Sequence, residues 1–596
     1  MRKLYTLLLL ALSALLPMTI EAAPVTVQQA RVKAVEFFQS GSMSRAVPTL
    51  ELAWSDQNLS RSNEEATLYI FNRTDAPGFV VMAGDDAAAP VLGYSFEHST
   101  GNLDEMPAHI RYWLDGMAEQ VRALRASGAA SQSAWQGALT AGSPIRELPT
   151  ALWNQGEPYN RECPVLSNGQ RAATGCVQTA AAIIIKYNRW PDSFNGTVTV
   201  PGYKTLGGIE IPARTLSSYD FDKLPDSYVS GQYTDEQAAE VARLMADLGT
   251  MDKAEYGTET GAYYSRLEWA LGEYMRYSKQ ASIVTRASYS DEQWAALIKK
   301  EIDANRPLLY DGHGPQGGHA FVLDGYDSED YFRFNWGWGG QMNGYFTVAN
   351  LVVGGSDYIT GQSMIIDLIP DKEGASSHND NLMLGSATLN TGEHINGLQL
   401  NVASVAPNVP FEAEVVFFNI AVTAYNGKVA MAVTTKSGDV KNLVSTEKPV
   451  VLNGGTDTAQ GLSYSGNYDA FDCVVTNTLT PGDRLRVVFW DNAKKKWVAM
   501  GSYVENAPYE IILMPDEVTA ETVAEGTSFA YDRTTKKLTI ATYNGVTVKL
   551  VGGSLSKEVK SDGQPVIFDL ASAAKGTYTL SLILESGESS SCKVIL

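Results

Sequence analysis

The most reactive side-chain type in this chain is cysteine, and one of the four cysteines opens a helix-favouring run. Cys176 lies in the stretch TGCVQTAAAIIIKY, which ends before Pro191. A thiol at a helix N-terminus faces backbone N–H groups and the positive end of the helix dipole, which favour the thiolate. Cys176 is therefore a candidate nucleophile. The alternative is a small buried cysteine at the start of a core helix.

A histidine at the start of an apolar strand provides the base that such a thiol needs. His319 follows Gly317 and Gly318 and lies 143 residues after Cys176, and papain-like enzymes have their histidine about 130 to 150 residues after the cysteine. The imidazole would take the thiol proton and later protonate an amine leaving group. The two glycines would let a substrate backbone approach closely. His313 competes for this role, but its loop setting offers less rigid positioning.

A run of tryptophan and glycine and a single glutamine complete the candidate site. The run NWGWGG begins 16 residues after His319. Asn335, Trp336 and Trp338 would orient or shield the imidazole, and Gly339 would bind substrate. The alternative is that these residues only fill a tight hairpin. Gln170, six residues before Cys176, would form an oxyanion hole with the Cys176 backbone N–H.

Two segments of mixed helix and strand must position these residues. Residues 24–148 combine helical periods with short strand-like runs and end in an Ala-, Ser- and Gly-rich linker at 126–141, which predicts a small α+β unit. Residues 149–371 place helices ahead of aromatic strands. Two pairs with capping-box spacing predict helix starts in this segment, namely Thr234 with Gln237 and Ser290 with Gln293.

The rest of the chain has a different character at each end. Residues 379–514 and 515–596 alternate apolar and polar residues in short runs between turn signals, which predicts two β-sandwiches. At the N-terminus, a basic start, an apolar run at 7–16 and a small-residue site predict a cleaved signal peptide over residues 1–23. The apolar run is too short to span a bilayer. We therefore expect a secreted or cell-surface protein.

Composition excludes several classes of function. The net charge of −21 repels nucleic acid phosphates and anionic lipids. The hydrophobic fraction of 44% and the charged fraction of 19% are those of a folded globular protein. Four scattered cysteines are too few for a disulfide scaffold. The six histidines lack ligand spacing, so we expect neither a metal site nor a cofactor.

Together the motifs resemble the streptopain family of secreted bacterial cysteine peptidases, which are distant relatives of papain. The resemblance rests on AATGCVQTA at 172–180, GGHAFVLDGY at 317–326 and FNWGWGG at 334–340, with WNQGEPYN at 153–160 and GFVVMAGDD at 78–86. It implies a zymogen with an inhibitory prodomain, in which Cys176 is the nucleophile and His319 the base.

Two weaker resemblances add to this reading. Papain's orienting Asn lies two residues before a Trp-Gly pair, and aligning that pair on Trp338-Gly339 places Trp336, not Asn335, at the orienting position. The third role therefore stays open. The last segment is similar to C-terminal β-sandwich domains that some Bacteroidetes proteins use for export or surface attachment.

The sequence therefore predicts an α+β protein whose papain-like peptidase domain follows a prodomain and precedes two all-β domains. Its predicted function is cleavage of protein or peptide substrates, with its own prodomain as intramolecular inhibitor. Two alternatives remain open. A transglutaminase-like acyl transferase would use the same Cys176 and His319, with Asp324 as third residue. A surface adhesin or binding protein would carry a catalytically dead peptidase domain. Oligomeric state and natural substrate stay open.

Overall fold

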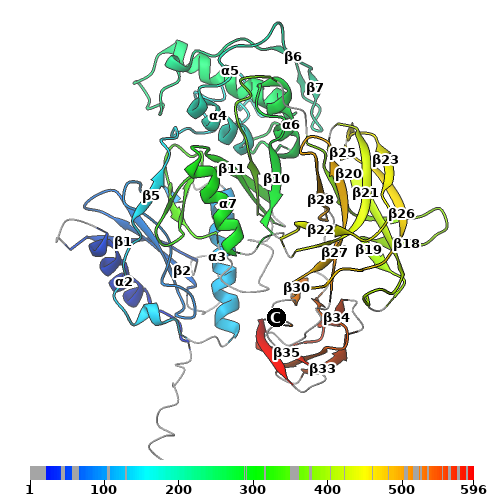
Figure 1. The fold of residues 1–596 in the computed structure, drawn as a ribbon. Helices are drawn as coiled ribbons and strands as arrows, with labels where there is room; N and C mark the ends of the chain where they lie inside the picture. Colours follow the sequence, from blue (N-terminus) through cyan, green and yellow to red (C-terminus); the bar gives the residue numbers. More distant parts are fainter. Residues whose placement is uncertain are drawn as a thin grey trace, which may run out of the picture.

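The computed structural model in Figure 1 describes most of the chain. It describes residues 22–595 except 42–46, 57–65, 104–107, 128–130, 263, 287–288, 290, 315–316, 349–361, 375–378, 403–404, 422, 436, 459–460, 481, 503–507, 514–522, 524–526, 533–535, 553–554, 562–564, 574–576 and 585–587. The apolar run of the predicted signal peptide lies outside these residues. No helix in the described part of the chain is long and apolar enough to cross a membrane.

One 11-stranded sheet joins the predicted prodomain to the predicted peptidase domain. Its order is β1-β2-β3-β4-β14-β13-β12-β11-β15-β10, with β5 paired to β12. The strands are β1 Leu50–Ser55, β2 Leu68–Arg73, β3 Phe79–Ala83, β4 Val91–Ser95, β5 Pro144–Glu147, β10 Ser282–Thr285, β11 Leu308–Gly314, β12 Gly317–Asp327, β13 Phe332–Asn335, β14 Gly344–Phe346 and β15 Gln362–Ile366.

The seam of this sheet is the antiparallel pair β4–β14, in which Tyr94 faces Tyr345 and Gly93 faces Phe346. Sequence analysis treats residues 24–148 as a separate unit and misses this pairing. Pairing between strands some 250 residues apart leaves no local sequence pattern. The alternation of apolar and polar residues in a strand is the same whichever neighbouring strand it pairs with.

Two helices pack on the prodomain strands, one on each face. Helix α2 (Val27–Ser40) begins at a capping box in which Thr26 and Gln29 bond each other's backbone. Helix α3 (Ala108–Ser127) lies on the opposite face. Both helices and the strands β2, β3 and β4 confirm the periodicities read in this segment. A short 3₁₀ turn, η4 (Ser133–Trp135), interrupts the predicted linker.

Helices cover both faces of the sheet where it is formed by residues 149–371, and one of them, α3, comes from the predicted prodomain. Helices α4 (Cys176–Asn188), α5 (Asp235–Met251) and α6 (Tyr264–Tyr274) share one core with Ala320 and Val322 of β12, whereas α7 (Asp291–Asp303) and α3 share the other core with Phe321 and Leu323. The alternation follows from the two-residue period of a strand. A 3₁₀ turn η5 (Phe221–Lys223) and two ribbons complete the segment, β6 Thr199–Val200 with β9 Arg214–Thr215 and β7 Tyr203–Lys204 with β8 Glu210–Ile211.

The two predicted helix starts have different outcomes. The capping box of Thr234 and Gln237 is present at the start of α5, so that prediction is confirmed. Ser290 lies outside the described residues, and α7 begins at Asp291.

The C-terminal half forms two all-β units, as predicted (Figure 1). The first pairs β20 Phe411–Asn419 with β16 Leu382–Leu384, β19 Leu398–Leu400 and β26 Ser465–Cys473, and packs this sheet on β21 Tyr425–Thr434, β22 Val440–Leu443, β23 Lys448–Leu452, β27 Arg484–Asp491, β28 Lys496–Ala499 and β29 Glu510–Ile512. Small ribbons are β17 Ser386–Thr388 with β18 His394–Asn396 and β24 Thr456–Thr458 with β25 Gly461–Ser463.

The second unit is smaller and has its own core. One sheet contains β30 Ser528–Asp532, β31 Lys537–Ala541 and β34 Val566–Asp569. The other has the order β33-β32-β35-β36, with β32 Thr547–Gly552, β33 Leu555–Lys560, β35 Thr577–Ile583 and β36 Ser589–Ile595. Apolar residues of both sheets form one buried cluster, which is the arrangement of a β-sandwich.

Candidate active site

Cys176 is the first residue of helix α4, as predicted. The helix is preceded by Gly175, whose φ of 98° lies in the region that favours glycine. Cys176 itself is half-buried, and the helix behind it, from Val177 to Ile185, is buried in the core shared with β12. A rigid, buried helix therefore fixes the position of the thiol.

The thiol environment differs from the expected one. Burial raises the pKa of Cys176 to about 11, and the nearby carboxylate of Asp311 also raises it. The backbone N–H groups of Ala320, Val177 and Cys176 lower the pKa, but by less than burial raises it. The expected low pKa is thus wrong for this form of the protein, because desolvation of the thiolate outweighs the helix N-terminus. Ala320 directly follows His319, so the thiol reaches the strand of the candidate base.

This pKa predicts a poorly reactive thiol in the precursor. A pKa of about 11 leaves about one thiol in a thousand ionised at pH 8, against about one in four for a free cysteine of pKa about 8.5. Iodoacetamide should therefore alkylate Cys176 in freshly purified precursor about 100-fold more slowly than a free thiol. The rate should rise about tenfold per pH unit up to pH 10. Peptide mass spectrometry measures this, and fast labelling that levels off below pH 8 would contradict it.

His319 lies on strand β12, is 3% exposed and is held by Trp336. Its Nε2 lies 3.2 Å from the Trp336 carbonyl oxygen. Its ring stacks on the rings of Trp336 and Phe321, with centroids 6.2 and 5.9 Å away. When Nε2–H donates to that carbonyl, Nδ1 carries the lone pair of the neutral imidazole. Nδ1 is then the atom that would accept a thiol proton.

The other members of the tryptophan run have structural contacts. The Asn335 amide donates to Thr150 Oγ1 at 3.0 Å and to the Ala151 carbonyl at 2.9 Å, which ties the start of the peptidase segment to β13. Trp338 is half-buried against the core. Gly339 donates its N–H to the Trp153 carbonyl at 2.9 Å. The Trp336 carbonyl thus lies within hydrogen-bond distance of His319, and the roles of the other residues stay predictions.

Gln170 occupies an exposed turn. Its side-chain oxygen accepts a hydrogen bond from Asn168 at 2.9 Å, and its backbone N–H donates back to the Asn168 side chain. Both hydrogen bonds of Gln170 with Asn168 thus lie within the turn. The oxyanion role of Gln170 stays a prediction. Gly317 and Gly318 lie at the β11–β12 hairpin, facing Gly314 and His313.

Sequence analysis misses a buried pair close to Cys176 in the chain. Gln178, two residues after Cys176, donates from Nε2 to a carboxylate oxygen of Asp252 at 2.7 Å, and both side chains are fully buried. Burial raises the pKa of Asp252 to about 8. The pair links the first turn of α4 to the end of α5.

Asp324, the third residue of the acyl-transferase alternative, has other partners. Its carboxylate pairs with Arg333 at 3.3 Å and accepts a hydrogen bond from the Thr150 hydroxyl. Burial raises its pKa to about 6. It lies five residues along β12 from His319, about 16 Å for an extended strand. Asp324 is thus placed to hold β12 against the segment at Thr150.

A tryptophan of the predicted prodomain lies against the same aromatic cluster as His319. Trp113 of α3 contacts Phe321, Phe334 and Trp336 edge-on, with centroids 5.8, 5.1 and 6.0 Å away. Its ring also covers Gly312, the cross-strand neighbour of His319, where an added side chain would lie 3.3 Å from the indole. In the sequence, Trp113 shows only as one apolar position of a helical period, so its function was not predicted.

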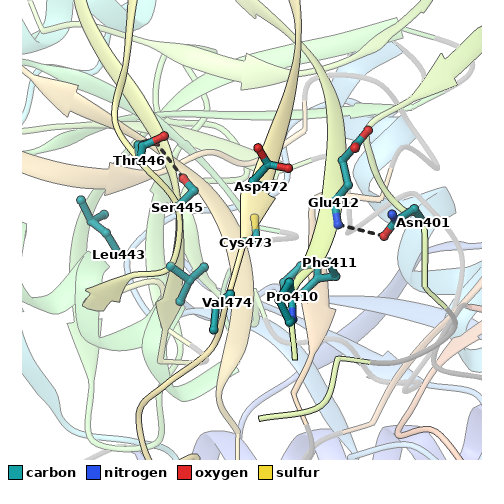
Figure 2. A pocket seen from close by; sticks show the side chains of 11 residues that line it. Asn401, Pro410, Phe411, Glu412, Leu443, Ser445, Thr446, Asp472, Cys473 and Val474 are labelled. Atoms are coloured by element: carbon teal, nitrogen blue, oxygen red, sulfur yellow. Dashed lines mark hydrogen bonds between the residues drawn. The ribbon is translucent and has the colours of Figure 1, made fainter. Parts of the chain in front are cut away.

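A cavity of about 540 Å³ lies elsewhere, in the first β-sandwich (Figure 2). It is lined by Asn401, Pro410–Glu412, Leu443–Thr446 and Asp472–Val474. Glu412 and Asp472 face each other in register across β20 and β26, and the Glu412 N–H bonds Asn401 at 2.8 Å. No candidate site residue lines this cavity.

Comparison with known proteins agrees with this geometry. Residues 153–346 match the Peptidase C10 family, and residues 22–121 match the Spi protease inhibitor family. The chain is 32% identical over 396 residues to the thiol protease/hemagglutinin PrtT of Porphyromonas gingivalis, covering 62% of this chain and 44% of PrtT. It thus spans less than half of that relative's length. It is 29% identical over 342 residues to streptopain of Streptococcus pyogenes, covering 54% of this chain and 83% of streptopain.

Among solved structures, a fragment of Prevotella intermedia prointerpain A is 27% identical, with a TM-score of 0.42, and the match covers 55% of this chain and 99% of that chain. The three motifs around Cys176, His319 and Trp336 all lie within residues 153–346. Residues 153–346 thus belong to the Peptidase C10 family, the family of streptopain, and an inhibitor-type prodomain precedes them.

Proposed function

We propose that this chain is the zymogen of a secreted bacterial cysteine endopeptidase, with Cys176 as nucleophile and His319 as base. One observation carries the proposal. The thiol at the N-terminus of α4 meets the backbone N–H of Ala320, next to His319, whose ring is held through Nε2 by the Trp336 carbonyl. The two side chains lie on opposite faces of β12 in this form of the chain, because Cys176 packs in the cluster of Ala320 and the His319 ring packs on Phe321 and Trp336. Maturation would turn the His319 ring toward the thiol, as a thiol protease requires.

In the mature enzyme, Nδ1 of His319 takes the proton of Cys176, and the thiolate attacks the carbonyl carbon of the scissile peptide bond. The developing oxyanion accepts a hydrogen bond from the Cys176 backbone N–H at the start of α4. The imidazolium then protonates the leaving amine, which gives a thioester to Cys176. Water, deprotonated by His319, hydrolyses the thioester and regenerates the thiol.

Residues 24–148 keep this site inactive. Strands β1–β4 extend the catalytic sheet beyond β14, and Trp113 packs on the cluster of Phe321 and Trp336 that holds the His319 ring. A raised thiol pKa and a histidine held beneath a prodomain indole together explain latency. Cleavage within 126–141 would release the prodomain and let both groups relax into the active arrangement.

Trp113 should therefore be the main inhibitory contact of the prodomain. Truncating a buried tryptophan to alanine removes about 3 to 5 kcal/mol of packing. Isolated residues 24–148 should inhibit the mature enzyme, and the Trp113→Ala version should have an inhibition constant at least about 100-fold higher. Inhibition of casein hydrolysis measures both.

The matched control for this prediction is Trp135→Ala. The Trp135 indole N–H bonds the Ala88 carbonyl at 2.8 Å within the prodomain, so its loss affects the prodomain without removing a ring from the His319 cluster. Equal weakening by both substitutions, or no inhibition by the unchanged prodomain at micromolar concentrations, would count against the role given to Trp113.

The proposed function is tested by the products. Mature protein incubated with casein should yield shortened peptides with new N-termini in mass spectra. New isopeptide bonds would instead identify an acyl transferase, and intact casein together with failure of a thiol-directed probe to label Cys176 would identify a binding protein. N-terminal sequencing of the protein with and without Cys176 shows whether it processes itself.

A further inference from the structure

Helix α3 is covered on two sides, which the inhibition of the active site does not require. Ile110, Trp113, Met117 and Val121 pack toward the large sheet. At 100° per residue, Tyr112, Gly116 and Ala123 lie on the other side of the helix. We call these three residues the outer face of α3. Gly116 is nevertheless buried, Tyr112 and Ala123 are half-buried, and the Tyr112 hydroxyl oxygen is buried.

The elements that contact α3 explain this burial. Helix α3 contacts β2 and β12 of the large sheet, and it also contacts β35 and β36 of the C-terminal β-sandwich. Figure 1 shows α3 between the large sheet and this last domain. The C-terminal sandwich therefore covers the outer face of α3.

Strand β36 is suited to such a contact. It is the last strand in the order β33-β32-β35-β36, so its outer edge has no neighbouring strand among those that the structure describes. Native proteins cover such edges with a helix or loop because exposed N–H and C=O groups attract other strands. The small residues Gly116 and Ala123 leave room on α3 for a strand to approach.

We infer that the C-terminal β-sandwich is a second binding partner of the prodomain, and that β36 holds α3 against the peptidase domain. This inference rests on the proposed function, since it concerns the regulation of the same site. Helix α3 carries Trp113 toward β12 and also contacts β35 and β36, so one rigid element is bound on both sides.

Two contacts on one helix have a kinetic consequence. After cleavage of the linker, the prodomain dissociates only when α3 has lost its contacts with the large sheet and with β36 at the same time. While either contact remains, it keeps α3 at a high effective concentration near the other surface, so the lost contact forms again. The sandwich therefore slows activation without touching Cys176 or His319. Release of the prodomain also uncovers the edge of β36.

The test uses the full chain carrying Cys176→Ala, so that no self-cleavage intervenes. A recognition site for an added sequence-specific protease is inserted after Gly137, which is exposed and has open space around it. After cutting, the dissociation rate of the prodomain is measured by size-exclusion chromatography of diluted samples. Gly116→Arg and Ala123→Arg should each dissociate at least about tenfold faster than the parent chain, equivalent to about 1.4 kcal/mol.

Gly116→Ala is the matched control. Both alanine and arginine favour helix over glycine, so neither substitution weakens α3 itself, but only arginine places a long charged side chain against β36. Circular dichroism verifies that every variant is folded. Faster release from either arginine variant, with Gly116→Ala unchanged, supports the inference. Unchanged release from both arginine variants, or equal acceleration by Gly116→Ala, overturns it.

The outcome is independent of peptidase activity. If the chain with Cys176 intact cleaves no casein, the proposed function fails, yet retention of the prodomain in the inactive chain still shows whether β36 binds α3. If the chain is an active peptidase and retention does not change, only the second binding partner is wrong. In the active chain, the same arginine variants should activate faster by a similar factor.

Discussion

Replacing Cys176 with alanine is expected to give a folded precursor that stays at full length and does not cleave casein. In the proposed mechanism, the Cys176 sulfur forms the bond to the substrate carbonyl carbon that gives the acyl-enzyme. Removing the nucleophile of a comparable hydrolase lowers kcat by about 10⁶-fold. The removed sulfur is half-buried at the start of α4, so the fold should tolerate the loss. Casein hydrolysis and N-terminal sequencing measure activity and self-processing.

Cys163→Ala is the control for that experiment. Cys163 is buried, and burial raises its pKa to about 12, so its thiol should take no part in the reaction. Its alanine variant should mature and cleave casein like the parent protein. Unchanged casein hydrolysis by Cys176→Ala would end the cysteine peptidase proposal.

Replacing His319 with alanine should be almost as damaging. A positioned general acid and base contributes about 10²- to 10⁴-fold, and in the proposed mechanism His319 acts both as base toward the Cys176 thiol and as acid toward the leaving amine. We therefore expect kcat/KM to fall by about 10⁴-fold at neutral pH. Steady-state kinetics on a peptide substrate measures this loss.

His313→Ala is the matched control on the neighbouring strand. His313 faces Gly318 in the β11–β12 register and competes with His319 in the sequence. Its variant should keep kcat/KM within a few-fold of the parent enzyme. A larger loss from His313→Ala than from His319→Ala would reverse the assignment of the base.

The positions of the two candidate catalytic residues in the fold were predictable because each has a local signature. Cys176 stands where a helix begins, and His319 stands where an apolar strand begins, and the structure has α4 and β12 at these places. The shift from Asn335 to Trp336 was also visible from alignment with papain. The structure adds that Trp336 holds His319 through its backbone carbonyl, which every residue type possesses and which a sequence therefore cannot reveal.

Other features depend on contacts between distant segments. The raised pKa of Cys176 reflects how deeply the thiol is covered by the folded chain. The placement of Trp113 on Phe321 and Trp336 requires α3 to cross a sheet shared by two segments. An amphipathic helix shows which of its faces is apolar, but not which partner covers it. For this reason the sequence indicated where Cys176 and His319 lie but not that Trp113 packs against Trp336 beside His319.

The junction of β4 with β14 makes maturation a change in sheet topology. While the prodomain is present, Tyr345 stacks on Tyr94 and Phe346 lies against Phe79. Release of the prodomain turns β14 from an interior strand into an edge strand. Its backbone amide and carbonyl groups and two aromatic rings then become exposed. An edge strand of only three residues is too short to pair readily with a strand of another copy of the chain. Release of the prodomain therefore exposes backbone groups of β14 without creating a long edge for self-association.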